Sequence, residues 1–306
     1  MGKLGLVVFC LLAGVLARRF RVFPDSAASA LNRFVIYFSL PAITLRQIHR
    51  LDFGGAENLA PIGLAWLLFA AAALVVYPLA RAQGWSRETA GALLLTAGLG
   101  NTSFVGFALL EALHGGAALP LGVLVDQPGT FLAMATLGVG AATWLSGRRL
   151  TPLAMLGRVL RFPPFVALVL AFLLRPFAMP PAVDEALERL GFTLVPLALT
   201  AVGLELRLSR GALRREARPL LLGLGFKLVL APLLAYAVYA PFLAKDGLPF
   251  RVIVLEAAMA PMITAGIVAS EHGLRPDLAS LMVGVGIPLS IAWVPFVDFL
   301  LGRLAA

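Results

Sequence analysis

The chain has 306 residues, of which 60% are hydrophobic and only 13% are charged, and its mean hydropathy is +0.93. A soluble domain is roughly 45–50% apolar and about 25% charged, so a water-soluble globule is excluded, and so is a disordered chain. The net charge of +9 would suggest nucleic acid in a soluble protein, but here a lipid bilayer accounts for it and we expect no nucleic-acid partner. The single cysteine, Cys10, excludes an intramolecular disulfide and a cysteine-based metal site.

Ten segments are candidates to cross a bilayer, for which a helix needs about 20 mostly apolar residues. In chain order they are 4–17, 31–47, 60–80, 89–112, 118–145, 162–179, 187–204, 219–243, 250–270 and 279–301. The first is short and ends before Arg18-Arg19, which also fits a signal peptide, but no small-residue cleavage site precedes a soluble domain. The predicted fold class is therefore an all-α polytopic membrane protein with ten transmembrane helices.

The basic residues predict the orientation of these spans. Of the 25 Lys and Arg, 16 fall after odd-numbered spans and 8 fall after even-numbered spans or at the termini, while Lys227 lies inside the eighth span. Cytoplasmic loops carry an excess of Lys and Arg. We therefore expect a multi-pass protein with both termini on the extracytoplasmic side.

The two halves of the chain echo each other, as an internal duplication would. Pro41 in the second span and Pro196 in the seventh are 155 residues apart, and His114 and His272, at the ends of the fourth and ninth spans, are 158 residues apart. Five spans per half is an odd number, so the second copy must be inverted. We expect two inverted five-helix repeats, 1–146 and 162–306, joined by a short cytoplasmic linker, 147–161.

Two spans at equivalent places in the repeats carry helix-breaking residues. Gly98, Gly100 and Gly106 surround Asn101 in the fourth span, and Pro261 follows 256–260 in the ninth. Glycine and proline destabilise a helix interior, so both helices are expected to break near mid-membrane. Broken helices must line a polar cavity or lie against protein, and their new N-termini attract a carboxylate. The glycines would alternatively serve only close helix packing.

Four stretches carry a family resemblance. They are 31–42 in the second span, 100–107 (GNTSFVGF) in the fourth, 126–130 with 136–138 in the fifth, and 260–262 followed by 279–280 and 288–290 in the ninth and tenth. In this order, over nearly the whole chain, they resemble the auxin efflux carrier family, which includes bacterial malonate and malate permeases and plant auxin exporters.

The resemblance implies ten helices in two inverted repeats, with broken helices 4 and 9 crossing at the substrate site. It implies a scaffold of helices 1, 2, 6 and 7 and a transport unit of helices 3–5 and 8–10, which slides against the scaffold as an elevator. It also implies a homodimer in the plasma (inner) membrane.

Two features depart from the family pattern. Family members usually have a proline two residues after the second glycine of the span-four motif, where this chain has Ala108. Glu256, five residues before Pro261, is similar instead to the sodium-site glutamate of bile acid–sodium symporters, which share the overall fold. An alternative function is therefore sodium-coupled symport of bile-acid-like organic anions.

Three ionisable residues lie deep in the expected spans: Asp126, Lys227 and Glu256. A charge at membrane depth costs several kcal/mol on most scales, so each needs a partner or a function. Lys227 could bind a substrate carboxylate, pair with Asp126 or Glu256, or snorkel to the membrane surface.

The expected site residues share polar oxygen or nitrogen atoms or a helix break near the crossing. For the substrate they are Asn101, Thr102, Ser103, Pro261, Lys227 and Asp126; for a coupling Na⁺ or H⁺ they are Glu256, Asn101, Gln127 and Thr130. Hard oxygen ligands suit Na⁺, and a buried carboxyl can instead carry a proton. We expect no catalytic residue, no cofactor and no metal other than Na⁺.

These observations predict a secondary active transporter of a small organic anion, auxin-like or dicarboxylate-like. An intramembrane hydrolase using Asp126 and Glu256 is a remote alternative, because no motif surrounds the two acids. A ligand-sensing membrane domain is a second one, and no soluble output domain is attached to support it.

Overall fold

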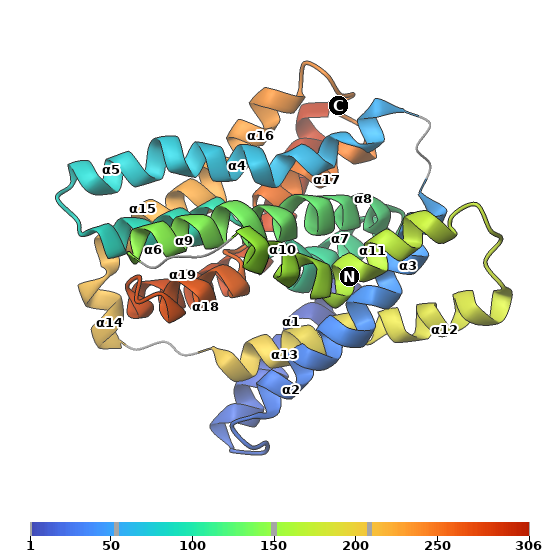
Figure 1. Ribbon diagram of the computed structural model, residues 1–306, viewed down its shortest axis with the longest axis horizontal. Coiled ribbons are helices and arrows are strands. Elements are labelled where there is room, and N and C mark those ends of the chain that lie inside the picture. Colours follow the sequence, from blue (N-terminus) through green and yellow to red (C-terminus); the bar gives the residue numbers. More distant parts are fainter. Residues whose placement is uncertain (1, 52–54, 148–151, 207–209, 306) are drawn as a thin grey trace.

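The computed structural model describes residues 2–51, 55–147, 152–206 and 210–305. These residues form helices, and one isolated β-bridge is the only strand-like pairing among them (Figure 1). The all-α prediction is confirmed. Residues 148–151 of the expected linker lie outside the described ranges, while 152–161 form a helix, α10.

The first half of the chain alternates α-helices with short 3₁₀ turns (η2, η3, η6) and π-helical turns (η1, η4, η5, η7, η8). In order they are α1 (Gly2–Arg19), α2 (Ala27–Phe34), η1 (Val35–Ser39), α3 (Leu40–Arg50), η2 (Ala56–Asn58), η3 (Ala60–Gly63), α4 (Leu64–Ala71), η4 (Ala72–Val76), α5 (Tyr77–Ala82), α6 (Arg87–Gly98), η5 (Thr102–Gly106), α7 (Phe107–His114), η6 (Gly115–Ala118), α8 (Leu119–Leu124), η7 (Val125–Phe131), η8 (Met134–Gly138) and α9 (Val139–Leu145).

The second half has longer uninterrupted helices and one π-helical turn, η9. In order they are α10 (Pro152–Arg161), α11 (Pro163–Leu174), α12 (Pro181–Phe192), α13 (Leu194–Glu205), α14 (Arg210–Arg215), α15 (Ala217–Gly225), η9 (Phe226–Leu230), α16 (Ala231–Tyr239), α17 (Leu248–Ala257), α18 (Ile263–Glu271) and α19 (Pro276–Ala305).

Six continuous helical segments in the described ranges are long and apolar enough to cross a membrane. They are Ala27–Arg50, Ala60–Ala82, Thr102–Leu145, Pro181–Glu205, Ala217–Tyr239 and Pro276–Leu304. Thr102–Leu145 has 44 residues, roughly 66 Å of helix, about twice the hydrocarbon core. It turns at Gly115, where φ is 70°, and α8 packs back on η5. It therefore holds both the end of the expected fourth span and the fifth.

The other expected spans are shorter or interrupted. α1 has 18 residues and ends in Arg18 and Arg19, and α11 has 12. The expected fourth span stops at Gly98 and resumes at Thr102, and the ninth stops at Ala257 and resumes at Ile263. The described structure thus contains fewer long apolar helices than the ten expected, because two spans are broken and two are short.

Prolines explain most of the π-helical turns. Pro41, Pro78 and Pro232 each lie two residues after a π-turn, η1, η4 and η9 respectively, and Pro128 lies inside η7. A proline has no N–H for the carbonyl four residues before it, and a locally wider turn absorbs the defect. Before Pro232, the carbonyl of Leu228 accepts the indole N–H of Trp293 instead (2.6 Å).

The helices pack in two groups (Figure 1). In the first group, α1 lies along α13, α2 packs on α13, and α3 packs on α11 and α12. In the second group, α6 packs on α5, α18 and α19, α16 packs on α17, and α4 packs on η7. The groups meet where α7 contacts α1, α8 contacts α3 and η5 contacts α13.

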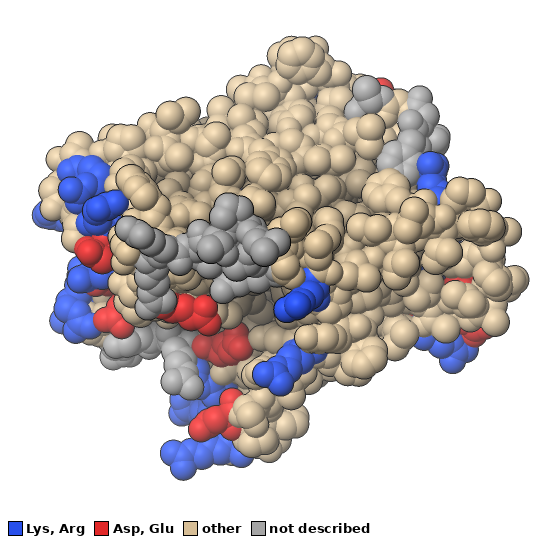
Figure 2. All heavy atoms as spheres, in the orientation of Figure 1, with Lys and Arg blue, Asp and Glu red and all other residues tan. Residues whose placement is uncertain are grey.

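Many of the exposed charged side chains are grouped on one part of the surface (Figure 2). Figure 2 shows Lys and Arg side chains along the edge where Figure 1 places α5, α14 and the turn between α1 and α2, beside a broad uncharged surface. Large apolar side chains on the surface include Leu74, Leu221 and Phe242. Such an apolar surface needs a nonpolar solvent, which a bilayer supplies.

α1 and α13 cross at two glycines. A Cβ on Gly14 would lie 2.3 Å from the Thr200 carbonyl oxygen, and a Cβ on Gly203 would lie 2.3 Å from the Leu11 carbonyl oxygen. Neither contact is possible for a real side chain, so only glycine permits this backbone approach. Close packing of this kind drives helix association in membranes.

We therefore predict that Gly14→Ala or Gly203→Ala separates α1 from α13 and lowers the free energy of unfolding by about 1–3 kcal/mol. Gly5→Ala, in the same helix with nothing within 4 Å of the new Cβ, is the matched control. Thermal unfolding in detergent measures both. An equal effect of Gly5→Ala and Gly14→Ala would contradict the packing role.

Candidate functional site

The two helix interruptions meet as a short antiparallel pairing. Gly100 and Pro261 form the β-bridge. The Asn101 N–H donates to the Ala260 carbonyl (2.7 Å), and the Met262 N–H donates to the Leu99 carbonyl (3.0 Å). The two breaks therefore satisfy part of each other's exposed backbone inside the membrane.

The residue types at the bridge fit its geometry. Gly100 and Pro261 face each other at a position that exchanges no hydrogen bonds between them, because the bonds come from the neighbouring residues. The missing N–H of Pro261 therefore costs nothing. A Cβ on Gly286 of α19 would lie 2.4 Å from Pro261 Cδ, so Gly286 makes room for the proline ring.

Two helix N-termini begin beside the bridge. Asn101 is the N-cap of η5, and its Oδ1 accepts the N–H of Val105 (3.3 Å); Met262 is the N-cap of α18. The first N–H groups of a helix have no partner within the helix, and its N-terminus carries partial positive charge. Two such ends close together form a site that favours an anion.

Asp126 is held by two hydrogen bonds. The Thr102 hydroxyl donates to Oδ1 (2.6 Å), and the Gln127 amide donates to Oδ2 (2.8 Å). Asp126 is only 4% exposed. The Thr102 bond crosses from η5 to η7, so it couples the helix that follows the first break to the fifth expected span.

Glu256 is buried, and neither of its carboxylate oxygens has a hydrogen-bond partner among the residues that the structure describes. They lie against Gly106, where an added Cβ would be 2.7 Å from Oε2 and 2.8 Å from Oε1. Asn101 Nδ2 and Gln127 Oε1 are likewise buried and have no hydrogen-bond partner in the described part of the chain. Buried polar atoms without hydrogen bonds cost free energy in a membrane interior. Several of them close together indicate a place where a bound ligand would supply the missing partners.

Lys227 is also buried, at 1% exposed, and its ammonium donates to the Ala257 carbonyl (3.1 Å). It interacts electrostatically with Glu256, which in turn interacts with Asp126. Lys227 does not snorkel to the membrane surface, because it is packed inside the protein.

A cavity of about 240 Å³ reaches these helix ends. Its wall includes Ser103 of η5 and Asp126 of η7, together with Met262 and Thr264 at the start of α18. The remaining lining residues are apolar side chains and come from both helix groups: Ile36, Leu40, Phe104, Phe131, Met134, Ala135, Val139, Phe162 and Val268. We call it the crossover cavity.

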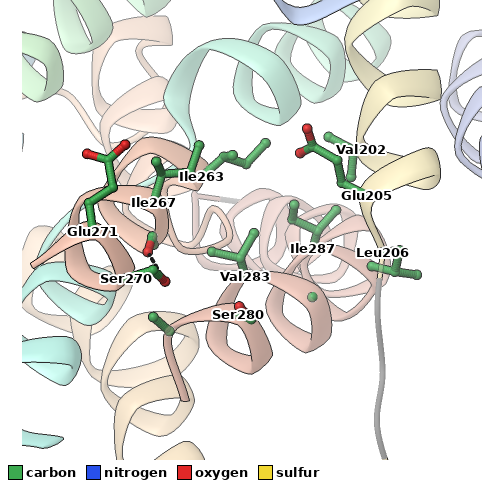
Figure 3. A pocket seen from close by; sticks show the side chains of 13 residues that line it. Val202, Glu205, Leu206, Ile263, Ile267, Ser270, Glu271, Ser280, Val283 and Ile287 are labelled. Carbon is green, nitrogen blue, oxygen red and sulfur yellow. Dashed lines mark hydrogen bonds between the residues drawn. The ribbon is translucent and has the colours of Figure 1, made fainter. Parts of the chain in front are cut away.

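A second cavity, of about 300 Å³, lies between the end of α13 and the helices α18 and α19 (Figure 3). Glu205 and Glu271 lie on opposite sides of it, and Ile263, Val283 and Ile287 line the space between them. It lies between α13 of the first helix group and α18 and α19 of the second, and most of its lining residues are apolar. We call it the interface cavity.

The structure brings most of the predicted site residues to one place. Asn101, Thr102, Ser103, Asp126, Gln127, Lys227, Glu256 and Pro261 are gathered around the bridge, whereas the Thr130 hydroxyl bonds to the Val125 carbonyl of its own helix (3.2 Å). Of the predicted site residues, Ser103 and Asp126 line the crossover cavity. The others lie outside its lining: Asn101, Thr102, Gln127, Thr130, Lys227, Glu256 and Pro261. The sequence did not predict that Gly106 makes room for the Glu256 carboxylate or that Gly286 makes room for the Pro261 ring. The only signal for these contacts was that both residues are glycine.

Most of the helical site residues lie on π-turns, whereas Glu256 lies in the regular helix α17. Thr102 and Ser103 are on η5, Asp126 and Gln127 on η7, and Lys227 on η9. π-turns frequently occur at functional sites because they displace a side chain relative to a regular helix.

We predict that Thr102→Val lowers the free energy of unfolding by about 1–3 kcal/mol, because it removes a hydrogen bond to a buried carboxyl. Thr136→Val is the matched control, since its hydroxyl bonds only to Leu132 of the same chain segment (2.6 Å). Thermal unfolding in detergent compares them. Equal losses in the two variants would contradict a special role for the Thr102–Asp126 bond.

Known proteins match nearly the whole chain. The family profile described as "Membrane transport protein" matches residues 2–297. An "Uncharacterized transporter" of Methanothermobacter thermautotrophicus is 28% identical over 291 residues, covering 94% of each chain. A "Putative malonate transporter" of Rhizobium meliloti is 25% identical over 295 residues, covering 92% of this chain and 89% of that protein. The chain therefore belongs to the membrane transport protein family of the auxin efflux carriers, and it is a multi-pass membrane transporter rather than an enzyme.

Proposed function

We propose that the protein is a secondary active transporter that moves a small organic anion across the plasma (inner) membrane by an elevator mechanism. The observation that carries the proposal is the pairing of the two breaks, which places the N-termini of η5 and α18 together on the crossover cavity. An organic carboxylate would bind there to free N–H groups and the Ser103 hydroxyl.

The crossover cavity supports a small substrate with an apolar portion. Its volume of about 240 Å³ is below the usual range of drug-sized pockets, roughly 300–1,000 Å³. Its lining combines the polar side chains of Ser103, Asp126 and Thr264 with apolar ones that include Phe104, Phe131 and Phe162. Both auxin-like and dicarboxylate-like acids are candidates, and the name of the Rhizobium relative favours testing malonate first.

The charges of the site support coupling to a cation. Asp126, Glu256 and Lys227 together carry one excess negative charge when all are ionised. An anionic substrate beside them would be repelled unless a Na⁺ or H⁺ compensates, because charges at low dielectric interact strongly. The Glu256 carboxylate oxygens, which have no hydrogen-bond partner among the described residues, are suited to either ion. The side-chain oxygens of Gln127, Asn101 and Thr130 would be the further ligands of a Na⁺.

The two helix groups support the elevator assignment. The first group, α1–α3 and α11–α13, would be the scaffold, and the second, α4–α9 and α15–α19, would be the transport unit. The interface cavity between them (Figure 3) gives room for relative movement. We extend the proposal to ten spans in two inverted repeats, 1–146 and 162–306, with extracytoplasmic termini, and to a homodimer.

We predict that the purified protein in proteoliposomes exchanges a labelled carboxylate across the membrane. Asn101→Ala removes the N-cap of η5 and Pro261→Ala allows the ninth span to re-form a helix, so each should lower transport at least about tenfold while the protein remains folded. Gly140→Ala, with nothing within 4 Å of the new Cβ, is the control. Unchanged transport by the two site variants would contradict this location of the substrate site.

We further predict that Glu256→Gln abolishes the dependence of transport on the coupling ion. The side chain keeps its size but loses its charge, so neither Na⁺ nor a proton is held by a carboxylate. Initial rates are compared with a Na⁺ gradient, a pH gradient and neither. Sodium dependence would favour the bile-acid-type symporter, and a variant that keeps the ion dependence of the wild type would contradict the role of Glu256.

A further inference from the structure

Lys227 occupies a position that the substrate and coupling assignments do not explain. Its ammonium lies outside the lining of the crossover cavity and donates a hydrogen bond to Ala257, the last residue of α17 (3.1 Å). An ammonium has three N–H donors, and this is the one hydrogen bond it makes among the described residues.

The surroundings of the ammonium are helix C-termini. α17 ends at Ala257, and α6 ends at Gly98, two residues before Gly100. A Cβ on Gly100 would lie 3.0 Å from Lys227 Nζ, so the ammonium is packed against the segment that leaves α6. The last carbonyls of a helix lack partners and carry partial negative charge. Two such ends, with Glu256 beside them, therefore attract a cation.

We propose that Lys227 is the resident counter-cation of the crossing, taking the place that a dissociable monovalent cation would otherwise fill. The helix N-termini at the crossing favour an anion, and the helix C-termini favour a cation. The Lys227 ammonium always occupies the place that favours a cation, because it is covalently attached to the chain. This proposal rests on the proposed transport function. Lys227 neutralises one negative charge of the two buried acids, Asp126 and Glu256, so that an exchangeable ion has only one further negative charge to balance.

The atoms around the ammonium are those that a small alkali cation would use. The Ala257 carbonyl already accepts from Lys227, and the Glu256 carbonyl oxygen is 3.5 Å from the Cβ position of Gly100. Carbonyl and carboxylate oxygens are hard ligands that suit Na⁺. Truncation of the lysine would leave these oxygens facing an unfilled space.

The test is chemical rescue of Lys227→Ala, without substrate. The purified full-length variant is heated in detergent with choline chloride, NaCl or methylammonium chloride at equal ionic strength. Binding to the folded state alone stabilises it. We expect Na⁺ or methylammonium to raise the midpoint of the variant by about 2–4 °C more than that of the wild type. Lys245→Ala, which removes an exposed lysine on a turn, should respond as the wild type does.

An equal response of Lys227→Ala and wild type to all three salts would overturn the proposal. If Lys227→Ala does not fold, the double variant Lys227→Met/Glu256→Gln decides. Removing one member of a buried charge pair is costly, whereas removing both is often tolerated. The double variant should recover at least half of the folded yield lost by Lys227→Met alone, and a further loss of yield would contradict a counter-cation role.

This result is separable from the transport proposal. A wild type without Na⁺ response or without carboxylate transport would contradict the coupling or the substrate, but not the rescue of Lys227→Ala. An unresponsive Lys227→Ala in a protein whose wild type transports would overturn only the role of the lysine.

Discussion

The structure depends on how two helices can break inside a membrane. Hydrocarbon offers no hydrogen-bond partner, so an interrupted helix is tolerated only where its backbone is satisfied by protein or faces a polar cavity. Here residues 99–101 and 260–262 pair with each other. Each break thereby stabilises the other, and neither would be stable alone. The pairing also fixes where the four half-helix ends lie, and those ends determine the electrostatics of the site.

The polar residues follow from that arrangement. N-termini of η5 and α18 lie at the crossover cavity, and the C-terminus of α17 lies at Lys227. At each break, the half-helix that ends there has a C-terminus that favours a cation, and the half-helix that begins there has an N-terminus that favours an anion. Asp126 accepts hydrogen bonds from Thr102 and Gln127, whereas Glu256 accepts none from the described residues and is packed against Gly106. Two acids in one site can therefore have different roles.

Much of the site was predictable because charge and helix breakers are rare in apolar spans. Asp126, Lys227 and Glu256 stand out where nearly every neighbour is apolar, and Pro261 marks its own break. Of the ten expected spans, six appear as long apolar helical segments in the described residues; the fourth and ninth are broken, as Gly98, Gly100 and Pro261 predicted, and α11 of the sixth has only 12 residues. The π-turns were not anticipated, since a proline signals a defect but not whether the chain absorbs it by a kink or by a wider turn.

The sequence by itself determined that the chain is a membrane protein, which of its segments are apolar enough to form spans, which residues break them, and which family it belongs to. These properties are local, because hydropathy and the backbone limits of glycine and proline act within one segment. Only the tertiary structure decided that the two breaks pair, that Gly286 makes room for Pro261, that Gly14 meets Gly203, and that the Lys227 ammonium reaches Ala257. Such contacts join residues far apart in the chain, and a glycine that permits an approach looks the same in sequence as one that only loosens a helix.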